Sequence, residues 1–317
     1  MTRRTLNMLT VDVEDWFHIL ECDEAPDRGA WSALPSRVER NTDRILELLD
    51  AAGARATFFT VGWVAWRHPD LVKRIADAGH ELASHGFWHE VVRRHDKASF
   101  AADLAASKRV IEDLTGRPVE GYRAAGNSIT PADAWAFDAI LEQGYTYDAS
   151  LCPGASSHGG FPSPYREPHQ IRCAAGTLDE IPSATLGLGG RRIPYGGGGY
   201  LRLFPYALLR MAIDLDNGLG RPTNLYVHPR EIDPEQPRME LPRLRSFKYY
   251  VGLRGAERKL ERLLGRYRFV GCREWLRERR PALLGKLLDV RDLAAESAPH
   301  PDPALVPPPP PVALAPA

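Results

Sequence analysis

The 317-residue sequence lacks the features of several protein classes. No uncharged run reaches the roughly 18 residues of a membrane helix, so we expect no integral membrane segment. Basic and acidic residues are equal in number, 41 each. The absence of net charge argues against a nucleic-acid partner. The four cysteines form no C-x-x-C pair, which argues against a zinc ribbon or redox motif.

Two further features of the sequence predict the cellular compartment of the protein. Four scattered cysteines in a chain of this length fit free thiols in a reducing environment. The apolar stretch behind Met1–Arg4 is interrupted by acidic residues too early for a signal peptide. We therefore predict a cytoplasmic protein.

Strand-like and helix-like patterns alternate along the first half of the chain. We predict strands at 6–13, 56–61, 80–84, 119–123 and 145–150, and helices at 36–52, 69–78, 97–115 and 130–143. Such alternation predicts βαβ units around a parallel sheet. Chain length and the number of units favour an α/β fold of the distorted (β/α) barrel type.

The second half gives fewer signals. Residues 152–200 are rich in Gly, Pro and Ser and predict long loops. Further strands are expected at 224–228 and 267–270, and helices at 255–264 and 273–280. We assign residues 1–281 to the barrel domain. Residues 282–317, mostly Pro and Ala beyond about 297, are expected to be a disordered or polyproline II tail.

Five reactive residues lie at or just after the ends of predicted strands. They are Asp12, His85, Arg123, Asp148 and His228. The carboxyl ends of barrel strands converge on one mouth, which holds the active site of such folds. We therefore expect a single metal-centred site at the C-terminal strand ends.

A metal site is indicated by histidines and carboxylates in this set. His85 and His89 have H-x3-H spacing, which can bring two imidazoles to one ion. Asp12, Glu14 and Asp15 crowd one strand end, where like charges repel unless a cation is present. Asp12 and Glu14 share a strand face, so one could bind the metal while the other takes a proton from water.

The ordered motifs TVDVEDW (10–16), SHGFWH (84–89), GYRAAGNSIT (121–130), YDAS (147–150) and LYVHPRE (225–231) resemble those of the polysaccharide deacetylases. This family is also called NodB-homology or carbohydrate esterase family four. The resemblance spans residues 6–233. The region from about 190 to 280 is similar to an extension found in a subgroup associated with exosortase/PEP-CTERM exopolysaccharide loci.

The resemblance implies a role for each candidate residue. Asp12 would be the catalytic base, paired with Arg123. His85 and His89 would bind one divalent metal, with zinc expected, and Glu14 or Asp15 would be the third ligand. His228 would be the general acid, tuned by Asp148.

The implied function is metal-dependent removal of N-acetyl groups from amino sugars of a poly- or oligosaccharide, in exopolysaccharide biosynthesis. The expected partners are an N-acetylated carbohydrate and exopolysaccharide assembly proteins. Two alternatives remain open. One is hydrolysis of another C–N amide bond, such as that of a cyclic ureide, on the same fold. The other is a carbohydrate-binding protein whose catalytic site has decayed.

Overall fold

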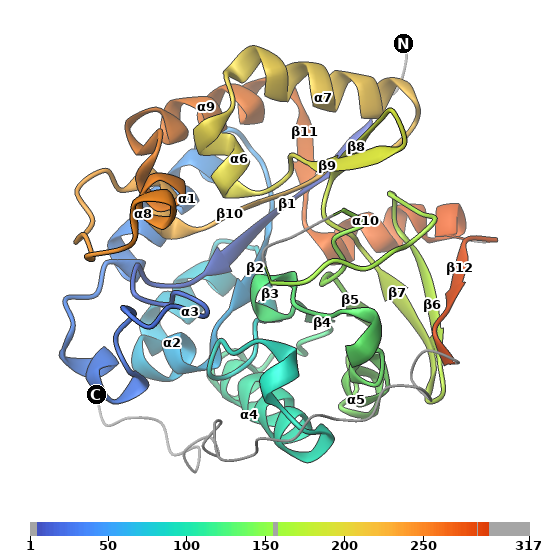
Figure 1. Cartoon of the computed structure of the whole chain (residues 1–317), viewed down its shortest axis with the longest axis horizontal. Coiled ribbons are helices and arrows are strands. Elements are labelled where there is room, and N and C mark those ends of the chain that lie inside the picture. The colour runs from blue at the N-terminus through green and yellow to red at the C-terminus, as the bar shows by residue number, and fades with distance from the viewer. Residues whose placement is uncertain (1–4, 155–157, 284, 292–317) are drawn as a thin grey trace.

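One ten-stranded sheet organises the computed structural model, which describes residues 5–154, 158–283 and 285–291 (Figure 1). The hydrogen-bonded order is β10-β1-β2-β3-β4-β5-β7-β6-β12, and β11 pairs with the first half of β1. All pairs are parallel except β6 with β7. The strands are β1 (Leu6–Val13), β2 (Thr57–Thr60), β3 (Glu81–Ser84), β4 (Gly121–Tyr122), β5 (Tyr147–Asp148), β6 (His169–Cys173), β7 (Gly176–Glu180), β10 (Asn224–Val227), β11 (Arg268–Val270) and β12 (Leu287–Asp289). A separate antiparallel hairpin is formed by β8 (Thr185–Leu188) and β9 (Arg191–Pro194).

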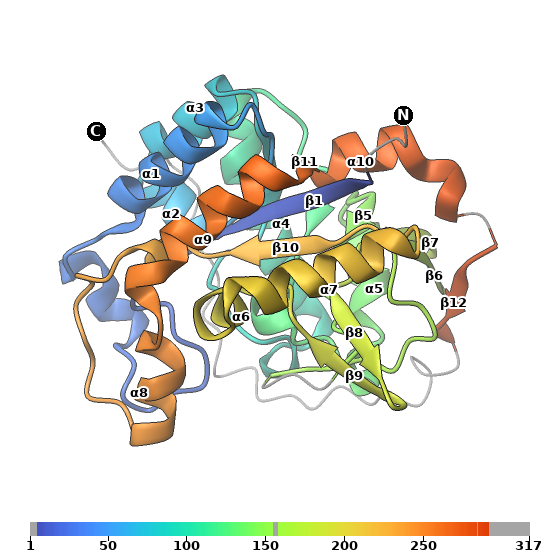
Figure 2. The same ribbon diagram turned by 90° about the horizontal axis from the view of Figure 1, so that it is seen from above.

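Helices surround this sheet. They are α1 (Val38–Ala51), α2 (Gly62–Arg67), α3 (Pro69–Asp77), α4 (Lys97–Thr115), α5 (Ala136–Glu142), α6 (Gly198–Leu203), α7 (Tyr206–Gly218), α8 (Arg243–Tyr250), α9 (Leu253–Arg266) and α10 (Cys272–Arg279). In Figure 2, α1, α2 and α3 lie on one side of β1 and β10, and α6 and α7 lie on the other. The long helix α4 begins at a capping box between Asp96 and Ser99 and ends at Gly116, whose φ of 63° suits glycine.

The alternation of side chains along β1 explains where the site forms. Leu9, Val11 and Val13 pack into the large core between sheet and helices. Leu6 and Met8 lie on the opposite face of the strand. They belong to a second core inside the curved sheet, to which α10 contributes Trp275 and Leu276. Because successive strand residues point to opposite faces, Asp12 continues this inner face toward the carboxyl end of the strand.

The predicted α/β fold with a parallel sheet is confirmed, and the sheet curves as an open, distorted barrel. Within the described residues β10 and β12 end the strand order and do not pair with each other. The predicted elements of the first half are all present, with ends shifted by a few residues.

Two expectations for the second half are wrong. Residues 152–200 are not only loops, because β6 to β9 lie between 169 and 194. These strands are short and partly exposed, so they give no clear hydrophobic pattern in the sequence. The tail cannot begin at 282, because β12 pairs with β6 and Val290 is fully buried. Residues 292–317, which include the Pro/Ala-rich stretch, lie outside the described residues.

Among the helices in the described ranges, none is both long and apolar enough to cross a bilayer.

Candidate active site and metal centre

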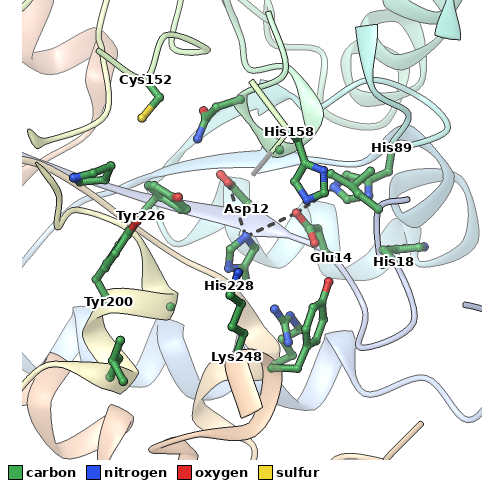
Figure 3. Close-up of a pocket in the computed structure, with 18 of the residues that line it drawn as sticks. Asp12, Glu14, His18, His89, Cys152, His158, Tyr200, Tyr226, His228 and Lys248 are labelled. Carbon is green, nitrogen blue, oxygen red and sulfur yellow. Dashed lines mark ion pairs between the residues drawn. The ribbon is translucent and has the colours of Figure 1, made fainter. Parts of the chain in front are cut away.

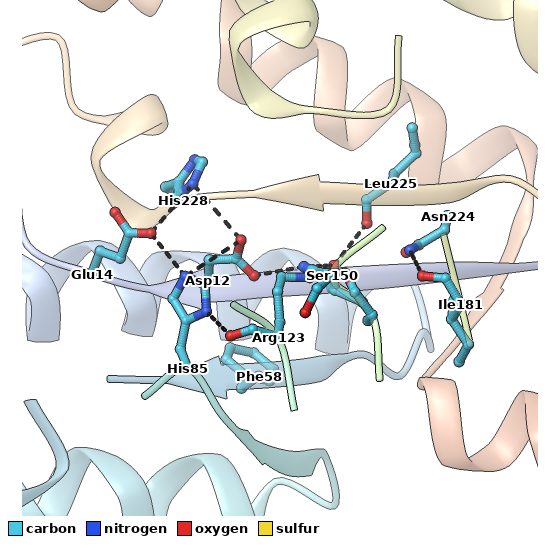
Figure 4. Close-up of polar contacts among 12 residues, drawn as sticks. Asp12, Glu14, Phe58, His85, Arg123, Ser150, Ile181, Asn224, Leu225 and His228 are labelled. Atoms are coloured by element: carbon cyan, nitrogen blue, oxygen red, sulfur yellow. Dashed lines mark hydrogen bonds and ion pairs between the residues drawn. The ribbon is translucent and has the colours of Figure 1, made fainter. Parts of the chain in front are cut away.

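The site begins with a buried ion pair at the end of β1. Arg123 Nη1 donates to Asp12 Oδ1 at 2.6 Å and to Thr10 Oγ1 at 2.7 Å. Both Asp12 and Arg123 are almost completely buried. A third bond from Arg123 Nε to the carbonyl of Ala149 fixes the guanidinium plane. The pair orients Asp12 and leaves its second oxygen, Oδ2, facing His85 and His228 at 4.0 and 3.8 Å (Figure 4).

Glu14 lies between two histidines of the loop after β3. Its Oε1 atom is 3.2 Å from His85 Nε2 and 2.9 Å from His89 Nε2. One donor atom from each of these residues lies within 4.8 Å of the others, and all three side chains are buried. Two imidazole nitrogens and one carboxylate oxygen are a donor set that suits a catalytic metal with open positions.

The hydrogen-bond contacts of the two histidine rings favour metal binding. His85 Nδ1 lies 2.8 Å from the carbonyl oxygen of Arg123, and because a carbonyl can only accept, Nδ1 carries the proton. The ring is thereby oriented so that Nε2 faces Glu14 and the site. His89 Nε2 is buried, and its polar neighbour at short range is Glu14 Oε1 at 2.9 Å. Both histidines therefore direct Nε2 at the Glu14 carboxylate, where one ion could take all three atoms.

The backbone of this loop is held in an unusual shape. His89 has a φ of 53° and Gly86 a φ of 73°, both in the left-handed region. The carboxylate of Asp103 on α4 accepts from the amides of Phe87 and Trp88 at 2.7 and 3.1 Å. A side chain at Gly86 would place its Cβ 2.9 Å from Asp103 Oδ2. The glycine thus lets α4 hold the loop that orients both histidines.

His228 approaches the same centre from the end of β10. Its Nε2 atom is 3.8 Å from Asp12 Oδ2 and 3.6 Å from Glu14 Oε1, and its Nδ1 is 3.4 Å from Glu231 Oε1. Burial alone would lower the pKa of His228, but the charges of Glu14, Glu231 and Asp12 outweigh it and raise the pKa to about 8. The ring is therefore a proton donor at neutral pH.

The two glutamates near His228 stay ionised. Burial alone would raise the pKa of Glu14, but His89, His228 and His85 hold it well below its usual value. Burial likewise opposes ionisation of Glu231, whose pKa is nevertheless lowered to about 2 by His228 and Arg202. The centre thus combines two anionic glutamates with one protonated imidazole.

Two family models match most of the chain. The model described as polysaccharide deacetylase matches residues 23–147, and the model described as a domain of unknown function, DUF3473, matches residues 149–277. A peptidoglycan deacetylase from Helicobacter pylori is 28% identical over 162 residues, covering 48% of this chain and 51% of that relative. A peptidoglycan-N-acetylglucosamine deacetylase from Bacillus cereus is 31% identical over 104 residues, covering 33% of this chain and 47% of that relative.

The chain is similar to the polysaccharide deacetylase family over residues 23–147. It spans about half the length of these curated relatives. A solved structure of a candidate polysaccharide deacetylase from Mycobacterium smegmatis has a TM-score of 0.62 to this chain at 20% identity, covering 90% of this chain and 94% of that one. At such identity the likeness shows the shared fold alone.

One residue predicted for the metal set, Asp15, lies elsewhere. Asp15 turns away from the histidines and accepts hydrogen bonds from the amides of Trp16 and Arg37 and from the hydroxyl of Ser36. Its carboxylate sits at the N-terminal end of α1, where unpaired amides and the helix dipole favour an anion. The structure therefore places Asp15 away from the histidines and Glu14 beside them.

A second correction concerns Asp148, which was expected to tune His228. Its carboxylate accepts from the amide and hydroxyl of Ser150 at 3.0 and 2.6 Å. Ser150 in turn accepts from the amide of Ala124, the residue after Arg123. Asp148 thus supports the segment that carries Arg123. The carboxylate beside His228 is Glu231, which the motif LYVHPRE contains but which strand-end reasoning overlooked because it lies in the turn Pro229–Ile232.

His18 is a further site residue that the sequence analysis missed. It lines the pocket together with His89, and its Nδ1 accepts from the amide of Asp15 at 3.0 Å. Burial and His89 hold the pKa of His18 well below its usual value, so the ring is neutral and its proton is on Nε2. The only signal in the sequence is its place three residues after Asp15.

These side chains open into a pocket of about 360 Å³ (Figure 3). Asp12, Glu14, His89 and His228 line it together with the aromatic residues Tyr200, Tyr226 and Tyr249. Tyr200 comes from α6 and Tyr249 from α8, both within the region that matches the domain of unknown function. That region therefore shapes the access to the centre.

Proposed function

We propose that the chain is a metal-dependent hydrolase that removes N-acetyl groups from amino sugars of a poly- or oligosaccharide. The observation that carries the proposal is the meeting, in one pocket, of the Asp12–Arg123 pair, the donor set around Glu14, and a protonated His228. Acyl hydrolysis needs a base for water, an electrophile for the carbonyl and an acid for the leaving amine. The pocket contains a candidate for each.

The proposed metal would be held by Glu14, His85 and His89. The approach of His85 Nε2 and His89 Nε2 to Glu14 Oε1, at 3.2 and 2.9 Å, supports this fit, as does the hydrogen bond from His85 Nδ1 to the carbonyl of Arg123. Nitrogen and oxygen donors of this kind favour zinc. When bound, the ion would act as a Lewis acid toward the acetamide carbonyl and toward water.

The residues of the chain would carry the protons. Asp12, oriented by Arg123, takes one proton as water adds to the acetyl carbon. His228 gives its proton to the sugar nitrogen as the C–N bond breaks, because an amine leaves poorly unless protonated. Glu231 contacts Nδ1 of the imidazole, on the side away from Asp12, where it orients the ring and raises its pKa. The products are acetate and a free amino sugar.

The decisive test is acetate release from N-acetylhexosamine oligosaccharides by purified protein. We expect release that a chelator abolishes and that added zinc restores. Turnover that persists with no bound metal by elemental analysis would instead favour hydrolysis of another amide, such as a cyclic ureide. Binding of the oligosaccharides with no acetate release under any metal would favour a carbohydrate-binding protein without catalysis.

A role in cytoplasmic exopolysaccharide biosynthesis, alongside assembly proteins, is the finer part of the proposal. It is supported by the resemblance of residues 190–280 to the exosortase-associated extension. Exopolysaccharide from a strain lacking the gene should carry more N-acetyl groups by nuclear magnetic resonance, and fractionation should find the protein in the cytoplasm. An unchanged polymer would contradict this role and leave the proposed chemistry intact.

A further inference from the structure

One wall of the pocket is cationic. Lys248 points into the pocket from the side of α8 (Figure 3), and Arg230 lines the pocket from the turn that follows His228. Helix α8 is tied over the pocket because Arg245 Nη2 donates to the carbonyl of Leu20 at 2.9 Å. The helix that carries Lys248 is therefore anchored beside the pocket.

The carboxylates in and behind the pocket already have basic side chains beside them. Asp12 is paired with Arg123 at 2.6 Å, and Glu14 lies within 3.6 Å of three imidazoles. Glu231 lies 3.4 Å from both Arg202 and His228. These pairings account for the negative charge of the centre, even before a metal ion is added.

Arg230 and Lys248 have no comparable partner. In the ranges that the structure describes, neither side chain forms an ion pair or a hydrogen bond with a carboxylate. Arg230 Nη1 is buried with no hydrogen-bond partner there. The charge of Arg230 contributes to lowering the pKa of Glu231. Glu231 is nevertheless beyond ion-pair distance of Arg230, and it is already paired with Arg202 and His228.

The guanidinium of Arg230 is nevertheless held in place. Its central carbon lies 4.4 Å from the centre of the Tyr249 ring, a distance at which the ring attracts the cation. A half-buried guanidinium whose nitrogen lacks a hydrogen-bond acceptor destabilises the folded state unless an anion accepts that hydrogen bond. A planar fork of N–H donors matches carboxylate and phosphate oxygens particularly well.

We propose that Arg230 and Lys248 form an anion subsite, and that the substrate carries a carboxylate or phosphate group close to the N-acetyl group that is removed. The inference rests on the proposed function for the identity of the sugar. Because Arg230 is two residues from His228, an anion bound there lies on the sugar unit being processed or on its neighbour. The preferred substrate class is therefore an acidic, N-acetylated polysaccharide.

The test is equilibrium binding of oligosaccharides that share one N-acetylglucosamine-containing backbone and differ only in charge. One carries a uronic acid, a second the same unit reduced to a neutral hexose, and a third a phosphate ester. Calorimetry on metal-loaded wild type should give an affinity about tenfold higher or more for a charged ligand than for the neutral one, decreasing with salt. The ligand with the larger preference identifies the anion.

Two variants and a matched control locate the effect. Arg230→Gln and Lys248→Gln should each reduce the ratio of charged to neutral affinity severalfold. Arg238→Gln is the control, because Arg238 also stacks on a tyrosine, Tyr250 at 4.9 Å, but does not line the pocket. It should keep the wild-type ratio. Lys248 is exposed, so its substitution should not affect folding.

Each outcome is informative. Equal binding of charged and neutral ligands by wild type overturns the subsite, and so does a preference that both variants retain. Acetate release is measured on the same ligands. A charge preference without acetate release supports the subsite and contradicts the proposed function, whereas acetate release with no charge preference contradicts the subsite alone.

Discussion

His228 Nδ1 lies 3.4 Å from Oε1 of Glu231, and the same carboxylate oxygen lies 3.4 Å from Nε of Arg202. The backbone amide of His228 also donates to Glu231 Oε2 at 3.2 Å. Glu231 is therefore fixed on both sides, and it both orients the imidazole and raises its pKa. Such a carboxylate–histidine pair keeps the histidine protonated at neutral pH, so that it has a proton to give.

The first prediction follows from this pair. Glu231→Gln removes a charge that raises the pKa of His228, so the pKa should decrease from about 8. The protonated, active form is then lost at lower pH, and the basic limb of the kcat/KM profile should shift down by about one unit. A profile with an unmoved basic limb would show that Glu231 does not tune the acid.

The second prediction separates Glu14 from Asp15. Glu14→Gln should lose metal affinity because it removes the charged oxygen beside His85 and His89. Asp15→Asn should retain the metal but decrease stability by about 1–2 kcal/mol, because the carboxylate holds the start of α1. Elemental analysis and thermal unfolding of both variants provide the measurement. Metal loss in Asp15→Asn alone would reverse the assignment.

The third prediction concerns the end of the chain. Truncation after residue 291 should leave the melting temperature unchanged, because the Pro/Ala-rich composition cannot build a core. Truncation after 281 removes the buried side chains of Leu283 and Val290 and the strand β12. It should cost about 3 kcal/mol or more. Equal melting temperatures for the two truncated chains would contradict this account.

Sequence patterns predicted the parts of this structure whose signals are local. The buried runs of β1 and β2 and the capped helix α4 are visible as hydrophobic periodicity and end signals. The strands β6 to β9 were not visible, because their pairing is set by distant segments and their faces are partly exposed.

The same limit applies to the site. The motif DVED brings Asp12 and Glu14 to one face by strand geometry, and the structure agrees. The different direction of Asp15 depends on the start of α1, more than 20 residues later. The partner of His228 was misassigned to Asp148 because both follow strands, whereas Glu231 reaches the ring only through a tight turn. Contacts that depend on tertiary structure were therefore the ones that the sequence did not reveal.

The fourth prediction separates the proton-transfer roles of His228 and Asp12. An activated aryl acetate has a leaving group that needs no proton, so His228→Ala should cleave it at nearly the wild-type rate while losing activity on N-acetyl sugars by 10²-fold or more. Asp12→Asn should be slow on both, because water must still be deprotonated. Equal losses on ester and amide in His228→Ala would indicate that His228 positions the substrate.

The most direct test of the central claim compares wild type with Asp12→Asn, each loaded with one metal ion per chain, on an N-acetylglucosamine oligosaccharide. Asp12 contributes no atom to the Glu14–His85–His89 donor set, so the variant should bind the metal. Acetate and free amine are measured together. We predict that wild type releases them in equal amounts and that Asp12→Asn releases neither above background. Undiminished release by metal-loaded Asp12→Asn, or no release by wild type, would contradict the account.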